Sequence, residues 1–255
     1  MFISWGTKGT STNLGYAADF CPMCRGIKGF QIMRIGKASH VYGMSVGSGD
    51  LVGHNRECTK CGVVLGANPA NYKEIVERTE KMNLDTLITA TFPTVREHHA
   101  ERLKLEAFIT QHPDKLEPAT RSKLLAEPFQ LMEHVVQQRF AKRHIDMTMV
   151  AIVIITLFFF QVAGNMAKTA APGQSPMGSV FLVVFIAACI ALIWQGRRAK
   201  RKYMRVTIYP VLANSLRALK PNTDELNAVQ AMLTKSKTAM AKHLQLKVLV
   251  PMINR

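Results

Sequence analysis

Two long apolar runs stand out from an otherwise mixed pattern of hydrophobic and polar residues. Residues 147–164 and 177–194 each comprise 18 residues without a charged side chain. As helices they would each be about 27 Å long, close to the roughly 30 Å hydrocarbon core of a bilayer. Their apolar residues occupy all sides of the helix rather than one stripe. The pattern predicts a two-helix transmembrane hairpin, and a pair of buried core helices is the alternative.

The charges that flank the two runs predict an orientation. Lys168 is the only charged residue in the connecting segment 165–176, whereas three basic residues, Arg139, Lys142 and Arg143, precede the first run. A basic cluster follows the second run and consists of Arg197, Arg198, Lys200, Arg201, Lys202 and Arg205. Positive charge concentrates on the cytoplasmic side of membrane proteins. We therefore expect a multi-pass membrane protein with both termini in the cytoplasm and this basic cluster at the membrane surface.

Short β-prone runs dominate the N-terminal quarter. The sequences GFQIMRIG (29–36) and KASHVYGMSVG (37–47) are rich in Ile, Val, Phe and Tyr. Glycines punctuate these runs at turn or bulge positions. The pattern predicts a small β region within residues 1–70.

Capping patterns predict helices in the middle of the chain. Asn71 with Glu74, and Thr94 with Glu97, fit the capping box. We expect helices over 72–82 and 95–111, with 84–89 as a short apolar link.

A proline and an apolar stripe predict the two later helical segments. Pro128 suits the first turn of a helix that runs unbroken into the first apolar run as a stalk. In the tail, Asn222 and Glu225 form a third capping-box pattern. An apolar stripe follows at Leu226, Val229, Leu233, Met240 and Leu244. We expect this stripe to contact the stalk or a sister subunit, and peripheral contact with a membrane is the alternative.

The charge balance adds a basic tail to this picture. The 255 residues include 33 Lys and Arg against 17 Asp and Glu, a net charge of +16. Most of the excess lies in residues 196–255. Such a surplus suits nucleic acid, an anionic membrane or an acidic partner protein. The N-terminus lacks a basic region followed by an apolar run, so it does not match a cleaved signal peptide.

Four of the five cysteines form two C-x2-C pairs. Cys21 and Cys24 are separated by 33 intervening residues from Cys58 and Cys61. A reducing cytoplasm disfavours disulfides, so four thiolates around one tetrahedral ion are expected. Zinc is the expected metal, in a structural role, because four sulfurs leave no open position for a substrate. Iron in a rubredoxin-like centre uses the same ligands and is the alternative.

Other candidate chemistry is weaker. His98 and His99 follow Glu97, but E-H-H is not the H-E-x-x-H zinc motif, and we find no G-x-S-x-G or Walker loop. His40 and His54 are expected to be surface histidines or histidines near the metal ligands. Enzymatic activity is therefore not expected.

The N-terminal region resembles a known group of proteins. MFISWGTKG, ADFCPMCRG, ASHVYGMSVGSGDLVGH and ECTKCG together resemble the zinc-ribbon region of uncharacterised bacterial membrane proteins. The resemblance implies a ribbon fold and a bound metal in about the first quarter of the chain, and no activity. Arg25 stands where glycine is usual after the first cysteine pair.

These inferences define an expected organisation: a small β zinc ribbon joined to a mainly α chain. We expect a zinc ribbon (1–70), a cytoplasmic helical region and stalk (71–145), a transmembrane hairpin (146–195) and a basic cytoplasmic helical tail (196–255). The expected function is a non-enzymatic scaffold or adaptor in the bacterial inner membrane, which contacts lipid and a protein partner or copies of itself. The alternatives are a membrane-tethered ribbon that binds nucleic acid and a subunit of an oligomeric channel or transport assembly.

Overall fold

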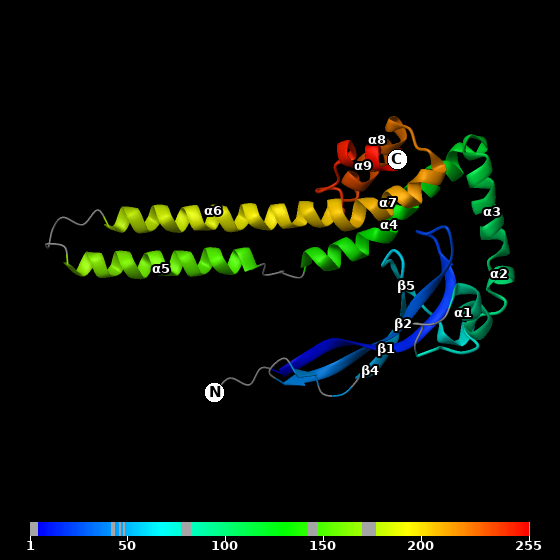
Figure 1. Cartoon of the computed structure of the whole chain (residues 1–255), viewed down its shortest axis with the longest axis horizontal. Coiled ribbons are helices and arrows are strands. Elements are labelled where there is room, and N and C mark those ends of the chain that lie inside the picture. The colour runs from blue at the N-terminus through cyan, green and yellow to red at the C-terminus, as the bar shows by residue number, and fades with distance from the viewer. Residues whose placement is uncertain are drawn as a thin grey trace. The chain divides into compact units, whose positions relative to one another are not determined.

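The computed structural model divides the chain into two compact units (Figure 1). One unit comprises Met1–Gln137 together with Ile208–Arg255, and the other comprises Gln138–Thr207. The structure describes residues 5–41, 44–45, 47, 49–77, 83–141, 147–169 and 177–254, with the side chains of 5–6, 41, 44–45, 163–169 and 177–182 excepted. Lys142, Arg143, the segment 170–176 and the Lys168 side chain, which bear on the predicted orientation, lie outside this description.

An antiparallel sheet forms the N-terminal part of the first unit. Its strands are β1 (Trp5–Cys21), β2 (Gly26–Val41), β4 (Asp50–Cys58) and β5 (Val64–Gly66), hydrogen-bonded in the order β1-β2-β4-β5. A two-residue strand, β3 (Met44–Ser45), also pairs with β2. Figure 1 shows β1 and β2 as long neighbouring strands.

The sheet is larger than the sequence predicted. The two β-prone runs both begin within one continuous strand, β2. Gly36 does not end this strand, because the pairing with β4 continues past a register shift between Ile35 and Gly36. Strand β1 was not predicted, because its first half is rich in Gly, Ser and Thr and shows no hydrophobic alternation. It forms because nearly every residue of β1 pairs with β2 in a register that begins at the Cys21–Gly26 turn.

Gly15 marks the point where β1 bends toward a neighbouring segment. The register of β1 shifts between Asn13 and Gly15, and Gly15 has a φ of 133°. The next residue, Tyr16, exchanges two backbone hydrogen bonds with Val76, at 2.7 and 3.0 Å. A Cβ at Gly15 would lie 2.6 Å from the Val76 carbonyl oxygen, so only glycine fits this approach.

The helices that follow the sheet differ from the predicted ones. Residues 72–77 of the predicted 72–82 helix are not helical, because Val76 pairs with β1 instead. The predicted link 84–89 lies within a helix, α1 (Leu84–Thr91), whose N-cap is Asn83. The predicted 95–111 helix is divided into α2 (Val95–His98) and α3 (Ala100–Gln111), and Thr94 precedes α2 without a side-chain capping bond.

Helix α1 joins the sheet through both packing and a hydrogen bond. Leu87 and Ile88 are buried in the core, with Phe30 and Ile32 of β2 among its other buried members. Thr91 at the end of α1 accepts a hydrogen bond from the Ala18 amide of β1 at 2.9 Å. Apolar burial of this kind is the main force that stabilises such a layer.

Helix α4 (Pro118–Ala141) begins ten residues before the predicted proline start. Pro128 lies inside this helix and is buried, so it does not begin a new one. Helix α5 (Met147–Thr169) follows, and residues 142–146 between the two helices lie outside the description. The predicted unbroken stalk is therefore neither confirmed nor contradicted.

The C-terminal tail forms part of the first unit. It contains α7 (Tyr209–Leu216), α8 (Thr223–Lys235) and α9 (Leu246–Ile253). The predicted capping box of Asn222 and Glu225 is confirmed. All five residues of the predicted stripe are buried, and Glu133 of α4 accepts hydrogen bonds from the backbone amides of Ala239 and Met240. The stripe therefore packs within the chain itself.

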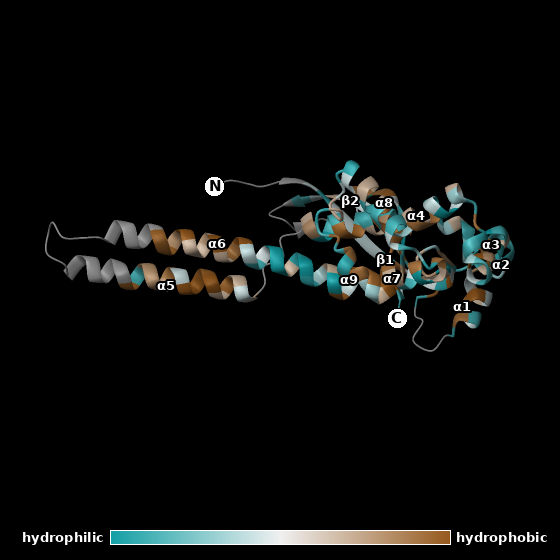
Figure 2. Cartoon of the chain, turned by 90° about the horizontal axis from the view of Figure 1, so that it is seen from above, coloured by the Kyte–Doolittle hydropathy of each residue, from teal (hydrophilic) through white to brown (hydrophobic). Residues whose placement is uncertain are grey.

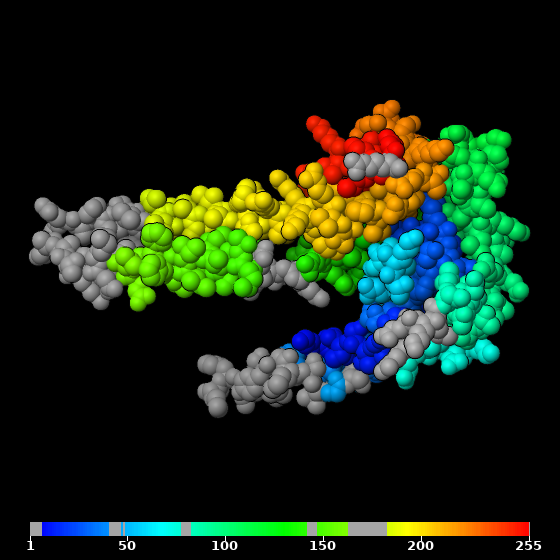
Figure 3. Space-filling view, viewed as in Figure 1, coloured from blue at the N-terminus to red at the C-terminus, as the bar shows by residue number. Residues whose placement is uncertain are grey.

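The second unit is a pair of helices. Helices α5 and α6 (Met177–Tyr203) lie side by side in both views, and the hydropathy colouring shows long apolar stretches on each (Figures 1 and 2). The space-filling view shows the two helices in contact (Figure 3). A π-helical segment, Met204–Ile208, follows α6.

The predicted transmembrane hairpin is not supported. Among the residues that the structure describes, none of the helices combines the length and the apolar character needed to cross a membrane. In α6 the apolar run gives way to Arg197, Arg198 and Lys200 within the same helix. The expectations of a membrane-spanning fold class, a transmembrane character and a multi-pass inner-membrane location are therefore wrong on this finding.

Candidate functional site

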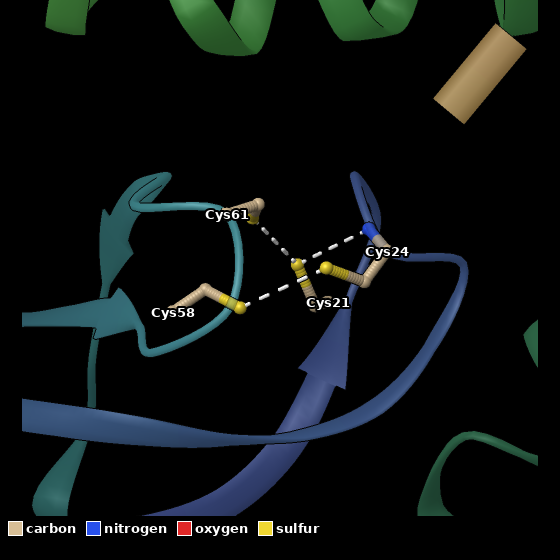
Figure 4. A group of neighbouring side chains, drawn as sticks. All are labelled: Cys21, Cys24, Cys58 and Cys61. Carbon is tan, nitrogen blue, oxygen red and sulfur yellow. Dashed lines mark hydrogen bonds between the residues drawn. The ribbon is translucent and has the colours of Figure 1, made fainter. Parts of the chain in front are cut away.

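The two cysteine pairs lie at the ends of paired strands. Cys21 ends β1 and Cys24 lies in the turn that leads into β2, while Cys58 ends β4 and Cys61 precedes β5. Each turn folds back on its first cysteine, since the Cys24 amide donates to Cys21 Sγ and the Gly62 amide donates to the Cys58 carbonyl. The pairing of β2 with β4 places the two turns together, and Figure 4 shows the four sulfurs converging.

The residue after each pair adopts the same unusual backbone conformation. Gly62 has a φ of 70° and Arg25, at the matching position after Cys24, has a φ of 54°. This left-handed region favours glycine, which explains why glycine is usual there. Arg25 therefore keeps the turn that glycine would make, at a conformational cost that its side chain offsets through the contacts described below.

The sulfur positions match a four-thiolate metal site. Cys21 Sγ lies 3.5 Å from Cys61 Sγ, Cys24 Sγ lies 3.9 Å from Cys58 Sγ, and all four lie within 4.8 Å of one another. Zinc–sulfur bonds of about 2.3 Å in a tetrahedron place the sulfurs about 3.8 Å apart. None of the four cysteines is in a disulfide. The four thiols could therefore hold one metal ion.

The close approach of the four thiols shifts their pKa values in opposite directions. Hydrogen bonding with the Cys24 thiol raises the pKa of Cys21, and the hydrogen bonds of the other three thiols lower the pKa of Cys58. Four thiolates this close would repel one another in a partly buried site, and a bound cation removes that repulsion. The ligand set suits zinc or iron, and the arrangement of sulfurs does not decide between them.

Arg25 ties the first cysteine turn to the helices. Its Nε donates to the Ser215 carbonyl of α7 at 2.6 Å, and its Nη1 donates to Glu106 Oε2 of α3 at 2.7 Å. Glu106 also accepts from Arg102, which in turn binds Glu127 of α4. The Arg25 and Glu106 side chains are only 10% and 6% exposed, so their ion pair is shielded from water. Arg102 and Glu127, at the other end of the network, are partly exposed. The first cysteine turn and three helices therefore share one polar network with a buried ion pair at its centre.

A second polar site, which sequence analysis missed, surrounds Asp19. Its side chain is 2% exposed and accepts hydrogen bonds from His99 Nε2 at 2.8 Å, from the Tyr72 hydroxyl at 2.8 Å and from Arg56. His99 was considered only within an E-H-H pattern, and Asp19 was not considered. The available signal was a carboxylate within the apolar stretch ending at Cys21, because a charge in a buried strand needs partners.

The basic cluster and His40 do not join either site. The basic cluster lies on α6 and the segment after it, with every member exposed except the partly exposed Lys200. Arg198 lies over the Trp194 ring and Lys200 over the Phe140 ring. The place predicted for the basic cluster at a membrane surface depended on the transmembrane hairpin. Because the hairpin prediction is wrong, that place has no support. His40 does not contribute to the four-cysteine group.

Comparison with known proteins adds no relative. No family model matches the chain, and neither a curated protein nor a solved structure shows significant similarity to it. The resemblance to zinc-ribbon regions therefore stays a prediction from the cysteine spacing and the glycine-rich insert. The class that the fold and site define is a β-sheet and helix unit with a four-cysteine site able to hold a metal ion.

Proposed function

We propose that this protein is a scaffold whose bound zinc ion maintains the ribbon and whose α5–α6 pair contacts protein, in the form of further copies of the chain or of a partner complex. A structural ion is favoured because four sulfur ligands complete a tetrahedral shell and leave no position for a substrate. The ion would also fix the turn that carries Arg25, which connects to α3 and α7.

The exposed apolar side chains of α5 and α6 carry the contact part of the proposal. Phe158 and Ile154 of α5 are 65% and 60% exposed, and Val183 and Ile190 of α6 are 64% and 61% exposed. Eleven further large apolar residues of the two helices are also exposed, among them Trp194. Isolated exposed apolar residues are ordinary, but a surface this extensive marks a contact site.

Nucleic-acid binding by the ribbon receives less support. Of the ribbon's basic residues, Arg25 is bound to Glu106 and Ser215, Arg56 is bound to Asp19, and Arg34 donates to the Gly49 carbonyl. Guanidinium groups engaged inside the protein are not available to neutralise phosphates on a nucleic acid. We therefore do not favour this alternative.

Site-specific photocrosslinking in cells tests the scaffold proposal. A photoreactive phenylalanine analogue replaces Phe158, and in a matched control it replaces Val52, which is 67% exposed on β4, outside the α5–α6 pair. We expect a discrete protein adduct from position 158 and none from position 52. An adduct of twice the chain mass identifies self-assembly, and another discrete mass identifies a partner. Absence of any protein adduct from position 158 would refute the contact.

A further inference from the structure

A cavity of about 540 Å³ lies beside Asp19 in the first unit. Strand β4 contributes His54 and Arg56 to its wall, α2 and its C-cap contribute His98 and His99, and the segment before Tyr72 contributes Asn68 and Asn71. Its volume is typical of sites for small molecules. Neither the metal site nor the proposed contact surface of α5 and α6 uses these side chains.

Asp19 has no hydrogen-bonding capacity left for a ligand. Its Oδ1 accepts from the Phe20 amide at 2.6 Å and from His99 Nε2 at 2.8 Å. Its Oδ2 accepts from the Tyr72 hydroxyl and from Arg56. A carboxylate offers about four acceptor positions, and here protein donors fill all four. Asp19 therefore acts as an internal anchor that fixes the orientation of His99 and Arg56.

The other polar groups around the cavity favour a negatively charged ligand. Asp19 is the only acidic residue among the described residues of the lining, and the adjacent Arg56 guanidinium opposes its charge. The rest of the polar lining consists of three imidazoles and two amides. An imidazole becomes a double donor when protonated, and an anion beside it stabilises that form.

Histidine packing makes this wall preformed. The His98 and His99 rings meet edge to face with centroids 4.7 Å apart, and His98 also lies 5.5 Å from the Phe92 ring. Because Nε2 of His99 is held by Asp19, its Nδ1 is the nitrogen left for another partner. Side chains that are already held in place bind a ligand with little loss of conformational entropy.

We propose that this cavity binds a phosphate group, either as the free ion or as part of a small phosphate ester. Phosphate offers enough acceptor oxygens to engage several of these imidazoles and amides at once, and its own proton can be donated to an imidazole nitrogen. The site is assigned to binding.

Histidine ring NMR on the full metal-loaded chain tests the assignment, with inorganic phosphate as the probe. We expect the ring signals of His54, His98 and His99 to move along one saturable curve, while those of His112 stay in place. His112 is exposed at the end of α3 and lies outside the cavity. Chloride at matched ionic strength separates phosphate binding from a general salt effect.

Two variants and a matched control make the test specific. His98→Ala removes an exposed ring that packs against the Phe92 and His99 rings, and His54→Ala removes a second wall residue. Each should weaken phosphate binding about tenfold, as loss of one charge-assisted hydrogen bond predicts. His112→Ala should leave the affinity unchanged. Unaltered metal content and circular dichroism confirm that each variant is folded.

The source of the phosphate is distinguished by a second titration. Adenosine monophosphate should bind more tightly than inorganic phosphate if the rest of the cavity holds the organic part of an ester. Equal affinities assign the site to the free ion. The proposal is overturned if phosphate produces no saturable shift, if chloride produces the same shift, or if His98→Ala and His54→Ala bind phosphate as well as the unmodified chain.

Discussion

The guanidinium of Arg25 lies 2.7 Å from the Glu106 carboxylate, although the two residues are 81 positions apart in the chain. Arg25 directly follows a candidate metal ligand, and Glu106 belongs to α3. This ion pair therefore links the first cysteine turn to α3, so that loss of structure in one weakens the other. It also accounts for an arginine at a backbone position that favours glycine.

Replacing Arg25 by glycine should destabilise the first unit by about 2 kcal/mol, because Glu106 would remain buried with Arg102 as its remaining ionic partner. Glycine adopts a φ of 54° without strain, so any loss of stability comes from removing the arginine side chain. Denaturant unfolding of metal-loaded protein measures the effect. Arg96→Gly is the control, since the Arg96–Asp85 pair is largely exposed and contributes little. Equal stability of Arg25→Gly and the unmodified chain would contradict the coupling.

Removal of the metal should unfold the cysteine turns and weaken the helices attached to them. Small four-cysteine sites derive much of their folding free energy from the ion, about 10 kcal/mol or more in zinc-finger peptides. We expect one metal per chain by elemental analysis, and loss of the cooperative thermal transition on chelation. Cys58→Ser should lower metal occupancy, whereas Cys189→Ser, on α6, should retain it. A chelated chain that melts like the loaded one would rule out a structural ion.

Gly15→Ala should destabilise the sheet by about 2 kcal/mol or more, because the new methyl group would collide with the Val76 carbonyl at a positive φ. Gly9→Ala on the same strand is the matched control, since a Cβ at Gly9 meets no atom within 4 Å. Thermal melts of the two variants provide the comparison. Similar melting temperatures would show that β1 does not approach Val76 as described.

Tyr72 should ionise late and contribute to stability only below strongly alkaline pH. Burial raises the pKa of Tyr72 to about 12, and the Asp19 charge adds to the increase while Arg56 opposes it. The folded state therefore holds the proton more tightly than the unfolded state, whose tyrosine titrates near 10. The stabilising contribution is complete below pH 10 and is lost as the pH rises toward 12.

Ultraviolet titration of tyrosinate measures this step. Burial also raises the pKa of Tyr203, so the comparison uses Tyr203→Phe with and without Tyr72→Phe. The second substitution should remove the latest absorbance step and flatten the alkaline loss of stability. Persistence of that step in the double variant would show that Tyr72 is not its source.

Local patterns predicted the features that depend on neighbours in the sequence. The Asn222 and Glu225 capping box is confirmed because both hydrogen bonds form within one helical turn. The buried stripe from Leu226 to Leu244 followed from apolar spacing. Patterns failed where a distant segment competed, since the predicted helix start at Asn71 gives way to the pairing of Val76 with β1.

The sequence by itself identified the candidate metal ligands, because the C-x2-C spacing within the pairs Cys21/Cys24 and Cys58/Cys61 is a local property and thiols have a strong intrinsic preference for soft metal ions. Only the tertiary structure decided how that chemistry is connected to the rest of the chain. Asp19 meets His99 across 80 residues and Arg25 meets Ser215 across 190. Contacts between residues so far apart in the sequence arise when whole helices and strands pack together. The hydrophobic periodicity of either segment alone does not specify them.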